Sequence, residues 1–519
     1  MKKIFIYLVF TGLFCTSCDD NLLTPFTPGS ITDDIAVQNS TGLRQLMNSA
    51  YNLLTNREDL VFTSVFTDEA GIGFANGGQG ISDNFIFFIN QTSFSPGEIW
   101  DNIYYSLARA NRVIVFADRL VPVDAADAEI IARTKAEALT LRALCHIKLM
   151  SYWSPDLKND DALAAVLADH IITGNVNARS TNGVFYTLIH SDLDAAIVLF
   201  NSLVLPTPAY VTNPTYYANL NLAKALKARA YAMKGNYADA EIWADNVIAT
   251  SGINLASSQF DYNKVFFTDN EPPNTEVIFR LKRTTQQNTQ GSNVHNGWCS
   301  VKPNLAGSPF YEVGRSLFNV LDSNPLDFRR KTIVAPSSII DPNYATSLDF
   351  INTDKLIIHK HGGVASGTTT AASTATNGFN NDIKICRISE MYLIKAEARA
   401  AAGDLLGAAN AVDAIRDKRF VANQPTPVYA NATAAWKGIL DERRLEFAFE
   451  GYRFIDIKRL GTLAGISGLD RDPQDYSSSS NNYPAANPTN LPLTSYKWAL
   501  PIPQSELNAN GGIQQNPGY

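Results

Sequence analysis

Two short stretches of this sequence, Tyr231–Ala240 (YAMKGNYADA) and Ala398–Ala408 (ARAAAGDLLGA), share one pattern. In each, an alanine-rich segment ends at a glycine, an Asn or Asp follows directly, and an alanine comes five residues after the glycine. Glycine adopts the left-handed conformation that ends many helices, and Asn or Asp can cap the next helix. The pattern therefore predicts a helix–turn–helix hairpin that occurs twice in the chain.

A single hairpin cannot bury its apolar face, so further helices must stack on it. Apolar residues three and four positions apart mark the helical segments. These are residues 41–55, 98–120, 128–153, 183–203, 217–250, 386–420 and 433–461. The hairpins resemble those of tetratricopeptide repeats, and the segments supply about four helix pairs. We expect an all-α, tetratricopeptide-like superhelix with long loop insertions and minor β structure, the latter at runs such as 276–279 and 355–358.

The composition is that of a mildly acidic protein. The 519 residues include 43 basic and 50 acidic side chains, for a net charge of −7. Proteins that bind nucleic acid usually carry a basic patch or stripe, and none is evident, so we expect no nucleic-acid partner. Aromatic residues are plentiful, with 21 Tyr, 27 Phe and 6 Trp. Rings outside the core would suit a carbohydrate ligand, whose C–H faces stack on flat aromatic surfaces.

The N-terminus has the features of a secretion signal. Lys2 and Lys3 precede an apolar run, residues 4–14. This run is too short to span a bilayer, which requires roughly 20 residues, and it is typical of a signal peptide.

The residues that follow resemble the lipobox of bacterial lipoproteins. Small residues come directly before Cys18, although Cys15 stands where leucine is usual. The resemblance implies that residues 1–17 are removed and that Cys18 is lipidated. Residues 18–35 would then be a tether anchored by lipid to the membrane. An ordinary cleaved signal peptide is the alternative.

Several blocks of sequence are similar to one known family, in the family's order. They are Arg387–Ala398 (RISEMYLIKAEA), Glu442–Arg459 (ERRLEFAFEGYRFIDIKR), Leu500–Leu507 (LPIPQSEL) and Gln515–Tyr519 (QNPGY), with looser matches at 100–111 and 137–152. On these blocks the chain resembles the SusD/RagB family of outer-membrane lipoproteins. We divide it into an N-terminal SusD-like helical region (36–260), a loop-rich insert that forms part of the ligand face (261–385), and a C-terminal RagB/SusD-type region (386–519).

The resemblance implies a non-catalytic protein on the cell surface, anchored to the outer membrane by lipid. Such a protein would bind a nutrient, most often an oligo- or polysaccharide. It would then deliver this ligand to a TonB-dependent, SusC-like transporter that it caps as a lid. The alternatives are uptake of peptides, as in the RagB branch, a surface glycosidase, and a repeat scaffold that binds only proteins.

The sequence shows little sign of catalysis. Glu446 and Glu450 could serve as the acid and base of a glycosidase, but one turn apart on one helix they would point the same way. We expect charges three residues apart to pair instead: Arg443 with Glu446, Glu450 with Arg453, and Asp456 with Arg459. His359 and His361 could ligate a metal, but no third ligand is evident. We therefore expect exposed histidines, no metal and no cofactor.

The ligand face should be built from loops, and two loops have a suitable composition: residues 68–94 and 284–315. Trp298 is the first candidate, because a tryptophan in a polar loop has no periodic core to join. The further candidates are Phe74, Tyr311, Asn76, Asn296 and Lys302. Packing of Trp298 against its own loop is the alternative.

Overall fold

The computed structural model describes residues 37–54, 57–74, 83–172, 177–284, 294–295, 298, 309–347, 350–361, 364–365, 372–373, 381–478, 481–483 and 486–519. Most of the regular structure in these residues is helical, as the sequence predicts.

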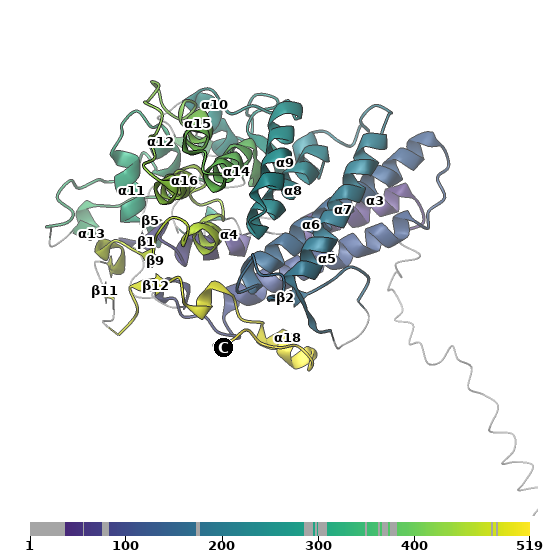
Figure 1. Cartoon of the computed structure of the whole chain (residues 1–519), viewed down its shortest axis with the longest axis horizontal. Helices are drawn as coiled ribbons and strands as arrows, with labels where there is room; N and C mark the ends of the chain where they lie inside the picture. The colour runs from purple at the N-terminus through teal and green to yellow at the C-terminus, as the bar shows by residue number, and fades with distance from the viewer. Residues whose placement is uncertain are drawn as a thin grey trace, which may run out of the picture.

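A row of helices forms the body of the protein, and each helix packs against the next. These helices are α3 (Ser40–Leu53), α5 (Phe94–Ala117), α6 (Ala125–Trp153), α7 (Asn182–Ser202), α8 (Leu220–Lys234), α9 (Tyr237–Thr250), α14 (Ile388–Ala401), α15 (Leu405–Arg416) and α16 (Ala432–Glu446). Figure 1 shows the row running from α3 and α5–α7, through α8 and α9, to α14–α16. Helices α9 and α14 lie side by side although residues 251–387 separate them. The predicted tetratricopeptide-like architecture is confirmed.

Both predicted hairpins form. Helix α8 ends at Gly235, whose φ of 84° is left-handed, and the Asn236 side chain accepts a hydrogen bond from the first turn of α9 at 3.4 Å. Gly403, with φ of 77°, follows α14 in the same way, and Asp404 caps α15 at 2.8 Å. Local sequence chemistry is therefore sufficient to place these turns.

Shorter helices and 3-10 turns complete the helical structure of the described residues. They are α4 (Arg57–Val65), α10 (Gln259–Phe267), α11 (Arg315–Asp322), α12 (Arg329–Ile333), α13 (Phe350–Thr353), α17 (Arg453–Leu460) and α18 (Gln504–Ala509), with 3-10 turns η3 (Asp83–Ile86), η4 (Pro214–Tyr216), η7 (Pro473–Tyr476) and η8 (Tyr496–Trp498).

The strands are short and pair in antiparallel ribbons. The pairs are β1 (Ala70–Ile72) with β5 (Tyr311–Val313), β2 (Leu163–Val166) with β3 (Arg179–Thr181), β4 (Val277–Leu281) with β8 (Ile383–Arg387), β6 (Val364–Ala365) with β7 (Ala372–Ser373), β9 (Gly468–Asp470) with β12 (Asn490–Pro492), and β10 (Ser477–Ser478) with β11 (Asn481–Asn482). The predicted β-like run 276–279 falls largely within β4, whereas 355–358 forms only isolated bridges.

One predicted helix, residues 433–461, is divided in two. Helix α16 ends at Glu446, and α17 begins at Arg453. Between them Phe449 and Gly451 have φ of 61° and 87°, which no α-helix accommodates. The chain therefore turns inside the most family-like block of the sequence.

Buried ion pairs tie this turn to distant parts of the chain. Glu446 accepts hydrogen bonds from Arg387 at 2.7 Å and from Arg419 at 2.9 Å. Glu450 pairs with Arg387 at 2.8 Å and with Lys360 at 2.6 Å. All five side chains are at most 1% exposed, so each charge depends on its partners for solvation.

The prediction of pairs three residues apart is wrong for two of the three. Arg443 pairs with Asp456 at 2.8 Å, and Arg453 pairs with Asp68 at 2.7 Å. Only Asp456–Arg459 forms, at 3.3 Å. Glu450 lies in the turn between α16 and α17, so it lacks the helical geometry on which its predicted pairing with Arg453 relied. Arg443 and Glu446 do share α16, but Glu446 is held by Arg387 and Arg419, and the turn brings Asp456 to Arg443.

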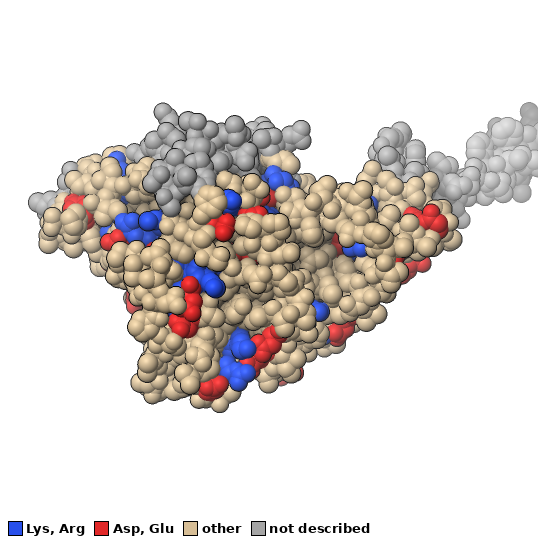
Figure 2. All heavy atoms as spheres, turned by 90° about the horizontal axis from the view of Figure 1, so that it is seen from above, with Lys and Arg blue, Asp and Glu red and all other residues tan. Residues whose placement is uncertain are grey.

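Charged side chains on the surface are mixed. In the face shown in Figure 2, basic and acidic residues lie next to each other in small groups, separated by wide uncharged areas. The described residues of this face form no continuous basic field of the kind that binds a phosphate backbone.

Candidate ligand-binding face

Trp298, the first candidate for ligand stacking, lies in the core. Its side chain is fully buried at 0% exposure, and its ring packs edge-on against Phe449 at 5.3 Å between centroids. Its carbonyl accepts a hydrogen bond from the Tyr311 amide at 2.6 Å. The expectation that this ring is exposed is wrong, because Phe449, far away in the sequence, supplies the apolar surface that the polar loop lacks.

The two histidines expected at the surface are also buried. His359 is 3% exposed and stacks on Phe267 at 3.9 Å, and burial lowers its pKa to about 4. His361 is 2% exposed and lies beside Trp298. Among the described residues, no group of His, Cys, Asp and Glu could hold a metal ion.

Of the other candidates, Tyr311 is 8% exposed and stacks on Phe85 at 6.0 Å. Its ring therefore supports the surface from beneath. Asn76, Asn296, Lys302 and the lipidation candidate Cys18 lie outside the described residues.

Among the predicted site residues that the structure describes, Phe74 has a half-buried ring, and it lies two residues after the end of β1. Its backbone amide donates a hydrogen bond to Glu312 at 3.1 Å, and the Lys355 ammonium lies 3.8 Å from the ring centroid. The preceding Gly73 donates to the carbonyl of Phe310 at 2.9 Å. A side chain at Gly73 would collide with Pro309 and Phe310, so glycine permits this close approach.

Further rings continue from Phe74 along the same edge. Half-buried Phe310 meets Tyr311 edge-on at 5.0 Å, Tyr311 stacks on Phe85, and Phe85 meets half-buried Tyr483 at 6.3 Å. We call Phe74, Phe310 and Tyr483 the aromatic edge. Phe310 lies in the predicted loop 284–315, although it was not singled out as a site residue, and the pairing of β1 with β5 brings it beside Phe74. Tyr483 lies outside both predicted loops and joins the edge through its contacts with Phe85 and Tyr476, which no local pattern indicates.

Carboxyl groups with raised pKa values lie beneath this edge. Burial raises the pKa of Glu312 and of Asp475 to about 7, and that of Glu69 to about 8. Glu312 and Asp475 line the same small cavity, of about 20 Å³. Such a cavity holds about one water molecule. These acids therefore cannot flank a sugar ring as the carboxylates of a glycosidase do.

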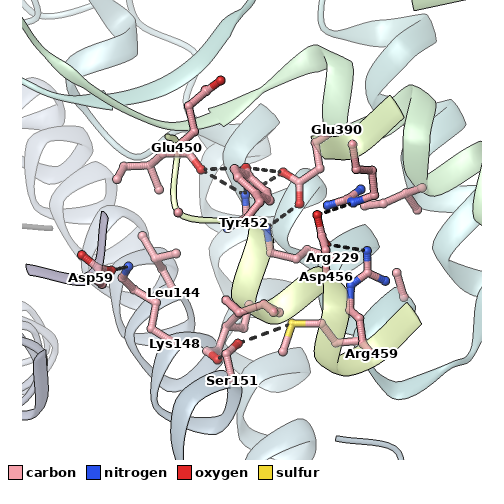
Figure 3. A pocket seen from close by; sticks show the side chains of 18 of the residues that line it. Asp59, Leu144, Lys148, Ser151, Arg229, Glu390, Glu450, Tyr452, Asp456 and Arg459 are labelled. Carbon is pink, nitrogen blue, oxygen red and sulfur yellow. Dashed lines mark hydrogen bonds and ion pairs between the residues drawn. The ribbon is translucent and has the colours of Figure 1, made fainter. Parts of the chain in front are cut away.

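A larger polar cavity lies inside the helical row. Figure 3 shows Arg229, Glu390 and Tyr452 pointing toward one another, with the Lys148–Asp59 pair on another wall. Arg229 binds both oxygens of Glu390, at 2.7 and 2.6 Å, and the Tyr452 hydroxyl donates to Glu390 at 3.1 Å. The cavity measures about 80 Å³, which suits a few waters rather than a sugar.

The glycosidase alternative also fails at Glu446 and Glu450. Both carboxylates are fully buried and held by arginines, as described above. Although burial alone would raise the pKa of Glu446, Arg419 and Arg387 lower it well below its usual range. A carboxylate held in this way cannot serve as a general acid near neutral pH.

Comparison with known proteins agrees with this architecture. Residues 336–519 match the family model described as the SusD family. A SusD superfamily protein from Bacteroides thetaiotaomicron is 22% identical, with a TM-score of 0.71 over 92% of this chain and 100% of that one. A SusD superfamily protein from Bacteroides vulgatus is 20% identical, with a TM-score of 0.70 over 93% of this chain and 99% of that one.

A third structure is a laminarin-binding SusD-like protein, 21% identical, with a TM-score of 0.62 over 93% of this chain and 100% of that one. No match was found among curated proteins. The C-terminal part of this chain, residues 336–519, is therefore similar in sequence to the SusD family, and the fold along almost the whole chain is that of SusD superfamily proteins.

Proposed function

We propose that this protein binds a nutrient glycan at the cell surface, without cleaving it, and delivers it to a TonB-dependent, SusC-like transporter in the outer membrane. The observation that carries the proposal is the aromatic edge on a SusD-family fold, one of whose structural neighbours is a laminarin-binding protein. Half-buried rings on a loop surface give a sugar flat apolar contact at low entropic cost.

The geometry around Phe74 favours preorganised binding. Glu312 fixes the Phe74 amide and also accepts a hydrogen bond from the Leu356 amide at 2.8 Å, so the segments on either side of the ring are tied together. The Lys355 ammonium lies over the Phe74 ring, and it can donate hydrogen bonds to sugar hydroxyls. A site held in this way loses little conformational entropy on binding.

The direct test is a binding screen of residues 19–519 against neutral and acidic polysaccharides, laminarin included, and against a peptide pool. Phe74→Ala should weaken glycan binding roughly 10-fold, which corresponds to about 1.4 kcal/mol. Phe260→Ala is a matched control, because Phe260 is an exposed ring with a lysine ammonium 4.1 Å from its centroid. The control should bind as the wild type does.

The outcomes separate the alternatives. Binding of peptides alone would replace glycan capture by the peptide uptake of the RagB branch. Release of reducing sugar from a bound glycan would establish a glycosidase. If Phe74→Ala and Phe260→Ala lost the same amount of glycan affinity, the aromatic edge would not be the binding site.

The proposed lipid anchor and partner have their own test. Cells expressing the full chain with an alkyne-labelled fatty acid should label the wild type but not Cys18→Ala. Wild-type protein cross-linked at the surface should co-purify with a TonB-dependent transporter. An unlabelled but exported wild type would favour an ordinary cleaved signal peptide.

A further inference from the structure

A second cleft lies between η4, the N-terminus of α8, the C-terminal end of α9 and the loop that precedes β4. It is formed by residues 212–221, 251–253 and 269–280, none of which belongs to the aromatic edge. Its volume is about 610 Å³. Pockets that hold small ligands typically measure roughly 300–1,000 Å³, so this cleft is large enough for a ligand of several sugar units.

The charges in this cleft satisfy one another. Arg280 forms an ion pair with Glu271 and lies 3.9 Å from Asp269, and its Nε donates to Thr215 at 2.9 Å. Asp269 in turn pairs with Lys384 at 2.5 Å. Two acids thus face two bases. An ionised ligand would find no unpaired counter-charge here, and it would pay for its desolvation without compensation.

The groups that remain available are neutral. In the part of the chain that the structure describes, the amide side chains of Asn270 and Asn274 and the hydroxyl of Thr212 make no hydrogen bond, and all three residues are exposed. Each amide offers donors and acceptors together, which matches the hydroxyl groups of a sugar. Pro272 and Pro273 lie in the same wall and present apolar C–H surface between the two amides.

The wall that carries these amides is held in place. Asp269, Asn274 and Glu276 have φ of 51°, 57° and 57°, a conformation that L-residues rarely adopt. The Asn274 carbonyl accepts a hydrogen bond from Asn254 at 2.9 Å, and the amide of Glu276 donates to the Asn254 carbonyl at 2.8 Å. These contacts fix the direction of the loop before any ligand arrives, which lowers the entropic cost of binding.

We infer that this cleft is a second ligand site, specific for a neutral oligosaccharide chain. The inference rests on the proposed glycan-binding function and extends it: the protein would hold one glycan at two places. Two weak sites on one body raise the apparent affinity for a long chain far above that for a short one, because the second contact is intramolecular.

The test uses isothermal titration calorimetry of residues 19–519 with laminarin, with neutral glucan, mannan, xylan and arabinan, and with acidic polygalacturonate. The cleft variant combines Asn270→Ala with Asn274→Gly. Glycine removes the side chain at 274 while keeping its left-handed backbone. Asn423→Ala, at an exposed asparagine in another loop, is the matched control. Thermal melts verify that every variant folds.

For a neutral polysaccharide that binds the wild type, the cleft variant should bind at least 5-fold more weakly. The residual binding should be abolished by adding Phe74→Ala. A short oligosaccharide should bind at two sites on the wild type and at one site on the cleft variant. The affinity for polygalacturonate should be unchanged by the cleft substitutions.

If a glycan binds, loses affinity in Phe74→Ala and is unaffected in the cleft variant, the second site is refuted while the proposed function stands. If the acidic polymer alone depends on the cleft, the assignment to a neutral ligand is refuted. If no polysaccharide binds at all, both proposals fall.

Discussion

Removal of the charge of Glu446 should destabilise the protein severely. Glu446 lies at the end of α16 and forms ion pairs with Arg387 at 2.7 Å, with Arg419 at 2.9 Å and with Arg329 at 3.5 Å. All four side chains are at most 1% exposed. In Glu446→Gln an amide of nearly the same shape replaces the carboxylate. The three guanidinium groups then remain buried with less negative charge between them.

Breaking a buried ion pair by neutralising one partner typically lowers stability by about 3–5 kcal/mol. The unfolding equilibrium should therefore shift between roughly 100-fold and 4,000-fold toward the unfolded state. Asp441→Asn is a matched control on the same helix, where the Asp441 carboxylate is 49% exposed and pairs with Lys437 at 2.5 Å. A surface pair of this kind contributes about 0.5 kcal/mol or less.

The assay is urea unfolding at pH 7, followed by circular dichroism and by tryptophan fluorescence so that the cooperativity of the transition can be checked. Glu446→Gln should have a much lower midpoint than Asp441→Asn. The reasoning would be refuted if the two variants unfolded at the same urea concentration, because buried and exposed carboxylates would then be equivalent.

Three other features lead to expected outcomes. Gly235→Ala places a side chain at φ of 84° and should destabilise by roughly 1–2 kcal/mol in urea unfolding, whereas Gly97→Ala, inside α5 with open space around it, should be neutral or stabilising. Burial raises the pKa of Glu69 to about 8, so the folded state holds this proton more tightly than the unfolded state. The uptake of this proton by Glu69 therefore contributes its whole stabilisation of the folded state below about pH 4.3, and this stabilisation is lost as the pH rises through about 8. Between pH 5 and pH 8 the free energy of unfolding should therefore fall less in Glu69→Gln than in the wild type. An equal fall in both proteins would contradict the raised pKa of Glu69. Burial also raises the pKa values of Cys145 and Cys386, so peptide mapping should find both thiols unlabelled by iodoacetamide until the protein is denatured.

The hairpins were predictable because their information is local. Gly235 and Gly403 need no distant partner to adopt a left-handed conformation, and Asn236 and Asp404 cap helices that begin at the very next residue. The repeated pattern then predicted that the hairpins stack, because the apolar face of one hairpin is buried only against the apolar face of a neighbouring helix pair. The sequence blocks that resemble the SusD/RagB family also predicted the order of these helices along the chain.

The candidate site was predicted only in part. Phe74 was singled out, but Trp298 was placed at the surface because its neighbours in sequence are polar. Its neighbours in space are Phe449 and His361, which no local pattern connects with it. Phe310 joins the site through the pairing of β5 with β1, a contact between strands that are far apart in the chain.

The sequence by itself determined the helical class, the turn positions and the resemblance of its C-terminal part to the SusD family, since caps, periodicity and short motifs act over a few residues. Only the tertiary structure decided which charges pair and which rings are exposed. Arg443 bonds to Asp456 and not to Glu446, because the chain leaves the helix after Glu446 and turns back at Gly451. Burial makes each such charge depend on its partner, and burial is a property of the whole fold.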